Sequence, residues 1–343
     1  MVLNVIWTQS PQSLVEAGWI RWLLRDFDIV EYVSPSLDVF KSNSIYILSS
    51  NNYPFSKLPT RFLEGVAQTS KKGLFHLSDE WYSGHYQVYS QFDFVLRNYH
   101  SDFFNNPAIK TVPLGPSNNA MDCSGIKLAT NRRYLWSFAG AKSAARMVMV
   151  KHLGNVEPHQ CAFFDSRRQQ KPVLDQKAFI ALLSDSVFSP CPMGNVLLET
   201  FRVYESLELG CIPIVERRPW MSYFDRLMPG HPLPAFSSWR KARQFVEELS
   251  TDGSGLRDYQ HVIGSWWQSY KLRLRTDVGS FVSQGLAGSL RSSLMADWRC
   301  PTGISYQMWR LVELLRHATM ASLQERIGLH GRRAVDRLLP PRR

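Results

Sequence analysis

Residues 186–215 combine features that could bind a phosphate. An apolar stretch leads into the turn CPMGN at 191–195, and a helix is expected to begin near Thr200. A helix that starts just after a strand presents free N–H groups and the positive end of its dipole, which together favour an anion. Arg202, in the first turn of that helix, could add a bidentate contact to a diphosphate. The segment therefore predicts an anion site.

Glu205 follows Arg202 by three residues, which puts both side chains on about the same helix face, one turn apart. A carboxylate there could accept hydrogen bonds from two hydroxyl groups, as the ribose of a nucleotide would offer at the crevice of a parallel sheet. The alternative is an exposed Arg–Glu pair on a solvated helix. The turn before the helix, and the sequence GCIPI at 210–214 after it, favour the nucleotide site.

A second group of polar residues could take up a proton. Asp79 and Glu80 follow the apolar run Gly73–Leu77, at the expected carboxyl end of a strand, where α/β proteins place their sites. Glu80 is the first candidate for a general base and Asp79 the second, with Glu16 and His85 as further alternatives. Either of the first two could instead cap a helix or face solvent.

No metal site is expected. His76, Asp79, Glu80 and His85 could be considered as ligands, but polar residues clustered in a loop more often face water. The five cysteines form no CxxC pair, so a structural zinc is not expected either. An odd number of cysteines in a chain of this size indicates a reducing compartment.

The elements that must position these residues are strand-like runs alternating with amphipathic helices, a pattern typical of an α/β fold with parallel sheets. One series begins at Val2–Trp7, and its first helix is expected from Ser13, where SLVE has the spacing of a capping box. A second series begins at Tyr134–Phe138, and the pattern becomes mainly helical from Ser238. We expect two Rossmann-like domains, at 1–125 and 126–290, followed by helices and a basic tail at 291–343.

The sequence resembles the exostosin-like glycosyltransferases. The resemblance rests on FSPCPMG at 188–194, Arg202, Glu205 and GCIPI at 210–214. Two further stretches agree in order, YLWSFAG at 134–140 with Arg146 after it, and HLSDE at 76–80 with RNY at 97–99. One departure is SP at 189–190, where the family usually has Cys-Leu.

The resemblance implies a bacterial-type member with a GT-B fold, in which two Rossmann-like domains face each other across a cleft. It implies an inverting hexosyl- or pentosyltransferase that needs no metal. The donor would be a nucleoside-diphosphate sugar, with a UDP-sugar as first choice, and the acceptor a saccharide or a lipid-linked polysaccharide precursor. Arg97 would lie on the acceptor side. The donor-binding residues would be Gly140, Lys142, Arg146, Pro192, Gly194, Asn195, Arg202 and Glu205.

The chain has 343 residues and a net charge of +11, which favours an anionic partner. Six Arg and one Asp in residues 326–343 give this tail a net charge of +5, so it could bind an anionic membrane, although such termini are often simply solvated. The N-terminus has the pattern of a strand and not of a signal peptide, and no apolar run approaches the ~18 residues of a membrane span. The expected location is the cytoplasm, at the inner face of the membrane.

Two other classes of function stay open. One is a catalytically inactive glycosyltransferase-like scaffold subunit, and the other is a basic nucleic-acid-binding protein. No nucleic-acid-binding motif is recognised, so nucleic acid is not the expected partner. The sequence GAKS at 140–143 lacks the glycines of a P-loop, which argues against an NTPase of that type.

Overall fold

The computed structural model describes residues 2–50, 57–82, 85–120, 125–165, 171–290 and 303–319. These residues form two compact units. The first contains the described residues of 1–123, 222–232 and 262–313, and the second those of 124–221, 233–261 and 314–343. The main segments meet between residues 123 and 124, whereas the sequence analysis placed the boundary between 125 and 126. The units differ from the expected contiguous ranges because two later segments of the chain return to the first unit.

The first unit contains a six-stranded parallel sheet. Its order is β2-β1-β3-β4-β5-β6. The strands are β1 (Val2–Trp7), β2 (Asp28–Val33), β3 (Ser44–Ser49), β4 (Lys72–Leu77), β5 (Phe94–Arg97) and β6 (Ile109–Thr111). Every residue of β3, β4 and β5 is buried. Burial on both faces explains why these strands appear in the sequence as apolar runs without alternation.

The helices of the first unit include α1 (Ala17–Leu24), α2 (Thr60–Gln68) and α6 (Tyr223–Leu227). The expectation that a capping box starts the first helix at Ser13 is wrong. Ser13 closes a short 3₁₀ turn, Pro11–Ser13, and its hydroxyl donates to the carbonyl oxygen of Ser10 at 2.7 Å. Helix α1 begins four residues later, which places Glu16 at its N-cap without a capping hydrogen bond from the side chain.

The second unit contains a five-stranded parallel sheet in the order β11-β10-β9-β7-β8. Its strands are β7 (Tyr134–Ala141), β8 (His159–Phe164), β9 (Ser186–Cys191), β10 (Ile212–Glu216) and β11 (Ala235–Phe236). If the strands of each sheet are numbered from one in chain order, the first five strands of both sheets have the spatial order 2-1-3-4-5. For the second sheet this order is read from β8 to β11. Each sheet therefore has one point at which the strand order reverses, between β1 and β3 in the first and between β7 and β9 in the second.

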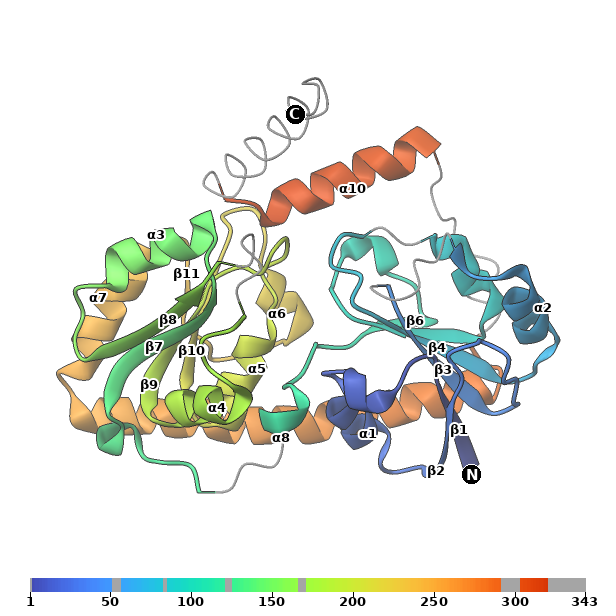
Figure 1. The fold of residues 1–343 in the computed structure, drawn as a ribbon, viewed down its shortest axis with the longest axis horizontal. Coiled ribbons are helices and arrows are strands. Elements are labelled where there is room, and N and C mark those ends of the chain that lie inside the picture. Colours follow the sequence, from blue (N-terminus) through green and yellow to red (C-terminus); the bar gives the residue numbers. More distant parts are fainter. Residues whose placement is uncertain are drawn as a thin grey trace, which may run out of the picture. The chain divides into compact units, whose positions relative to one another are not determined.

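Helices cover both faces of the second sheet. They are α3 (Ala144–Leu153), α4 (Gln176–Ser184), α5 (Phe201–Glu208) and α7 (Trp239–Ser250). Helices α3 and α7 pack against each other, as Figure 1 shows, whereas α4 and α5 both contact β9. The connections from β7 to β8, from β8 to β9 and from β9 to β10 each join two parallel strands. Each therefore crosses back over the sheet, and each contains one helix.

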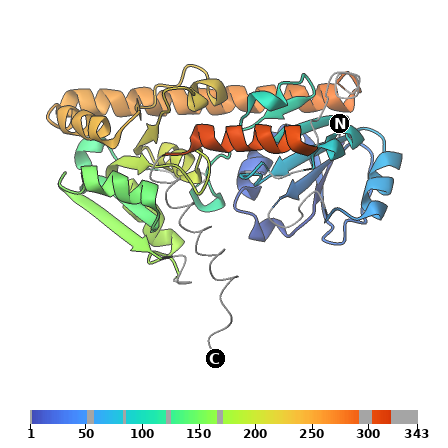
Figure 2. The same ribbon diagram turned by 90° about the horizontal axis from the view of Figure 1, so that it is seen from above.

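Two more helices supply residues to both units. Helix α8 (Gly253–Leu286) is continuous over 34 residues (Figure 2), and α10 is Gly303–His317. Short 3₁₀ turns lie at Tyr86–Gln91, Asp102–Phe104, Asn118–Ala120 and Ala129–Asn131. In the described ranges, no helix has both the length and the apolar character needed to cross a membrane.

Candidate functional site

The reversal point of the second sheet brings the two predicted phosphate-binding segments to one edge. Strand β7 ends at Ala141 and its neighbour β9 ends at Cys191. The turn before α3 follows the first of these strands, and the turn at 192–195 follows the second. Ligands of open α/β sheets bind beyond the carboxyl ends of the strands at such a point.

Arg202 reaches from the first turn of α5 to the end of β7. Its Nη2 donates to the carbonyl oxygen of Ala139, and its guanidinium carbon lies 4.2 Å from the centre of the Phe138 ring. Its Nη1 is buried and has no hydrogen-bond partner among the described residues. Burial lowers the pKa of Arg202, an effect that Cys191 and Glu205 partly oppose. A half-buried guanidinium with a buried N–H group that lacks a partner is suited to bind an anion.

The N-terminus of α5 has no side-chain cap. Thr200 occupies the N-cap position, but its hydroxyl caps no N–H group and is buried without a partner among the described residues. An uncapped helix start is a favourable place for an anion. Together with Arg202, this edge presents a cation, a hydroxyl and a helix dipole.

Glu205 is 8% exposed, so the alternative of a solvated surface pair is wrong. Two other predicted donor residues lie after β7. Lys142 is exposed, whereas Arg146 is half-buried, and its Nη1 donates to the carbonyl oxygen of Ala141 at 2.8 Å. Ser143 caps α3 by accepting from the N–H group of Arg146 at 3.4 Å.

A buried ion pair that the sequence analysis missed holds the turn after β9. Glu216, the last residue of β10, accepts from the N–H group of Met193 at 3.1 Å and pairs with Arg218 at 2.7 Å. Arg218 donates to the carbonyl oxygen of His317 at 3.0 Å, and Nδ1 of His317 accepts from the N–H group of Leu198 at 3.2 Å. These contacts fix the loop on which the predicted donor residues Pro192, Gly194 and Asn195 lie.

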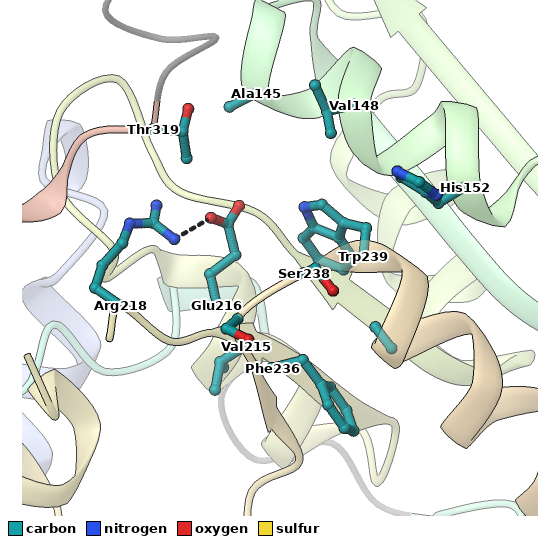
Figure 3. A pocket seen from close by; sticks show the side chains of 12 residues that line it. Ala145, Val148, His152, Val215, Glu216, Arg218, Phe236, Ser238, Trp239 and Thr319 are labelled. Carbon is teal, nitrogen blue, oxygen red and sulfur yellow. Dashed lines mark ion pairs between the residues drawn. The ribbon is translucent and has the colours of Figure 1, made fainter. Parts of the chain in front are cut away.

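Two cavities lie at the carboxyl ends of this sheet. One of about 340 Å³ is lined by α3, by the ends of β10 and β11 and by the start of α7. Figure 3 shows the paired Glu216 and Arg218 at one side of it and His152 at the other. The second, of about 720 Å³, is lined by Gly140, by Phe179 and by the residues before α4. Because the Arg202 guanidinium lies 5.4 Å from the Phe179 ring, the larger cavity is the one that adjoins it.

In the first unit, Asp79 lies beyond the end of β4, where it faces Arg97. The Nη2 of Arg97 is 3.3 Å from Oδ2 of Asp79, and their side chains are 0% and 1% exposed. The Tyr86 hydroxyl also donates to Asp79. The guanidinium carbon of Arg97 lies 3.3 Å from the centre of the Phe104 ring, and its Nη1 donates to the Tyr89 hydroxyl at 3.2 Å. The structure thus places Arg97 in the interior as a counter-charge, whereas an acceptor-side role would require an accessible guanidinium.

The remaining candidates for a base differ in burial. Glu80 is half-buried in the turn after Asp79, and His85 is exposed. Glu16 is 3% exposed and accepts from the Ser78 hydroxyl at 3.4 Å. Burial raises the pKa of Glu16, against smaller lowering effects of its own N–H group and of Ser78.

A model of the Exostosin GT47 domain matches residues 57–234, which is more than half of the chain. The chain belongs to the exostosin GT47 family. The match includes the turn after β9, both residues of the Arg202–Glu205 pair, and Asp79 and Glu80. Glu16 and His317 lie outside it. No curated protein matches the sequence.

Solved structures show the fold of this exostosin GT47 protein. An α1,3-fucosyltransferase is 12% identical with a TM-score of 0.51, covering 83% of this chain and 90% of that chain. A mutant of the Thermobaculum terrenum O-GlcNAc transferase is 9% identical with a TM-score of 0.51, covering 85% and 67%. The Anabaena protein HepE, in complex with UDP and glucose, is 10% identical with a TM-score of 0.50, covering 84% and 100%. With the family match, these likenesses make the protein a glycosyltransferase of the GT-B fold.

Metal ligands are not grouped in the described part of this family member. Within those ranges, no cluster of three or more His, Cys, Asp or Glu residues could hold a metal ion. His76 is occupied by hydrogen bonds at 2.6 Å to Ser50 and to Tyr89. The expectation that the enzyme needs no metal stays a prediction, which chelation tests.

Proposed function

We propose that the protein is an inverting glycosyltransferase that takes a hexosyl or pentosyl group from a nucleoside-diphosphate sugar, with UDP-sugars as first choice. The acceptor is a hydroxyl of a saccharide or of a lipid-linked precursor in polysaccharide biosynthesis. The observation that carries the proposal is the half-buried Arg202, whose buried Nη1 has no partner among the described residues, beside the uncapped start of α5. These groups match the diphosphate that leaves in such a reaction.

In this proposal, the donor binds at the reversal point of the second sheet. Arg202 donates to the diphosphate, and Glu205, one helical turn further along α5, accepts from the ribose hydroxyls. Arg146 and Lys142 add positive charge from the segment after β7. Because such cations can stabilise the charge that develops on the leaving group, the reaction can proceed without a metal.

Transfer with inversion also needs a proton acceptor for the attacking hydroxyl. The carboxylates beyond the carboxyl ends of the first sheet are the candidates. Asp79 is already engaged by Arg97 and Tyr86. Glu80 is half-buried in the adjoining turn, and Glu16 is the more deeply buried alternative.

The test is binding of UDP and GDP by calorimetry, followed by turnover of a panel of UDP- and GDP-sugars with mono- and oligosaccharide acceptors. We expect binding of one nucleotide, and release of the same nucleotide during turnover, with and without EDTA. The anomeric configuration of the product, read by NMR, checks inversion. A purified protein that binds neither nucleotide would contradict the proposal.

We further propose that the basic tail attaches the enzyme to the cytoplasmic face of an anionic membrane, where a lipid-linked acceptor would be found. The tail, residues 326–343, lies outside the described residues, so the support is its net charge of +5. Co-sedimentation with phosphatidylglycerol and phosphatidylcholine vesicles, with and without residues 326–343, tests it. Equal sedimentation of both proteins would exclude this role.

A further inference from the structure

Glu16 is a buried carboxylate that forms no ion pair with the described residues. It is 3% exposed, and among the described residues its carboxylate contacts only the Ser78 hydroxyl, at 3.4 Å, and its own N–H group. No ion pair with a Lys, Arg or His side chain offsets its burial in that part of the chain. Buried charges are normally paired, because an uncompensated one destabilises the fold. A group that opposes folding in this way is a candidate for function.

The backbone around Glu16 is held in place from a distant part of the chain. Asn118 donates through its backbone N–H to the carbonyl oxygen of Val15 at 2.9 Å, and through Nδ2 to that of Leu14 at 2.6 Å. Its Oδ1 accepts from the N–H group of Gly18 at 2.6 Å. Asn118 thus binds the backbone on both sides of Glu16, and this fixes the position of the Glu16 backbone from which the side chain extends. Such support for a single side chain is what a preorganised site needs.

Ser78, the partner of Glu16, has an unusual backbone conformation. Its φ is +60°, in the left-handed region that residues other than glycine rarely adopt. This conformation directly follows β4, and the hydroxyl of Ser78 reaches Glu16 from there. Backbone strain of this kind concentrates at functional sites, where surrounding structure maintains it.

Glu16 also has the favoured position in the topology. It follows β1, which lies beside β3 at the reversal point of the first sheet. The donor-side residues after β7 occupy the equivalent place in the second sheet. Glu80 instead follows β4, which is separated from the reversal point between β1 and β3 by the strand β3.

We propose that Glu16 is the proton acceptor of the transfer, an inference that rests on the proposed glycosyltransferase function. The acceptor oxygen forms a bond to the anomeric carbon while its proton passes to the Glu16 carboxylate. The bond from that carbon to the diphosphate breaks, and its electron pair leaves with the nucleotide. The proton on Glu16 is then released to solvent. Ser78 and Asn118 are positioning residues for this step.

The experiment compares Glu16→Gln with the wild-type enzyme in three measurements. Turnover of the donor identified in the panel is expected to fall by ~10²–10⁴-fold, the usual loss for a general base. UDP or GDP affinity should stay unchanged. The melting temperature at pH 7.5 should rise by roughly 2–4 °C, because the amide removes a buried unpaired charge. A carboxylate with only a structural role would lower the melting temperature when it is replaced.

Glu31→Gln is the matched control, since Glu31 is in the same unit and pairs with Arg21 at 2.6 Å. It should leave turnover intact and should not raise the melting temperature. Glu16→Asp retains a carboxylate and should recover part of the lost turnover. Glu80→Gln is the competing variant, and under this proposal it keeps most of its activity.

The outcomes separate the two proposals. If wild-type protein turns over no donor of the panel, both proposals fail. If it is active and Glu16→Gln retains that activity, or loses it together with a lowered melting temperature, only the assignment of Glu16 is overturned. A large loss in Glu80→Gln with an active Glu16→Gln would transfer the role to Glu80.

Discussion

The two sheets share a strand order but carry opposite chemistry at their carboxyl ends. In the second unit this edge presents Lys142, Arg146 and Arg202, and in the first unit it presents Glu16 and Glu80. Cations and unused N–H groups suit a leaving diphosphate, whereas a carboxylate in a dry setting suits proton uptake. One topology thus supplies two similar edges, and a few side chains after the strands decide what each can do.

Each unit combines a neutralised buried ion pair with a buried group that the described residues leave unsatisfied, which is the Glu16 carboxylate in the first unit and Nη1 of Arg202 in the second. In the first unit, Arg97 and Asp79 neutralise each other in the interior. In the second, Arg202 keeps an unused N–H group, although Glu205 lies near it. A satisfied pair maintains the fold, while an unsatisfied group is available to a ligand.

The largest expected effect tests this contrast in the first unit. Arg97→Ala should reduce the free energy of unfolding by about 3–5 kcal/mol, because it leaves Asp79 buried without its counter-charge. Urea unfolding measures the loss, and Arg97→Lys, which retains a positive charge, should lose less. A stable Arg97→Ala protein with impaired acceptor use would restore the acceptor-side role for this residue.

In the second unit, Arg202→Ala should weaken nucleotide binding and leave the fold intact. Loss of a charge-assisted hydrogen bond costs about 1.5–3 kcal/mol, which is roughly tenfold to 150-fold in affinity. Calorimetry with UDP and GDP measures the change. Arg243→Ala is the control, because Arg243 pairs with Glu247 at an exposed site in the same unit. The nucleotide affinity of this variant should match that of wild type.

Glu205→Ala should weaken binding by about tenfold, near the lower end of the same range, since it removes contacts to neutral hydroxyl groups. The proposed contact between Glu205 and the ribose hydroxyls gives a more specific prediction. The variant should lose its preference for UDP over 2′,3′-dideoxy-UDP, as measured by competition. Equal discrimination in variant and wild type would place the ribose elsewhere.

The smallest expected effect is on the pH dependence of stability. Burial raises the pKa of Glu16 in the folded protein, so the folded state favours the neutral carboxyl. The contribution of Glu16 is therefore fully present below the ordinary pKa of a glutamate and is lost as pH rises through the raised value. The melting temperature of wild type should fall relative to that of Glu16→Gln between about pH 4 and pH 8. A constant difference would show that Glu16 is not desolvated.

Local signals in the sequence were sufficient for much of the fold. The strand expected at Val2–Trp7 is β1, and the one expected at Tyr134–Phe138 begins where β7 begins. Helix α3 also starts at a local signal, because Ser143 caps it through a contact three residues away. The placement of Arg202 and Glu205 on one helix was equally predictable, because positions three apart in a helix lie on about the same face.

Contacts between distant parts of the chain were decided only by the tertiary structure. The spacing of Ser13 and Glu16 fits a capping box, yet the fold turns Glu16 toward Ser78, 62 residues away. Asp79 and Arg97 gave no sign of pairing, and the contact of Arg218 with His317 joins residues 99 apart. The sequence by itself determined which residues could carry charge and which segments form helices and strands, because those properties depend on near neighbours. Which charge is neutralised and which is left for a ligand depends on what the sheets bring together, and that is set by topology and packing.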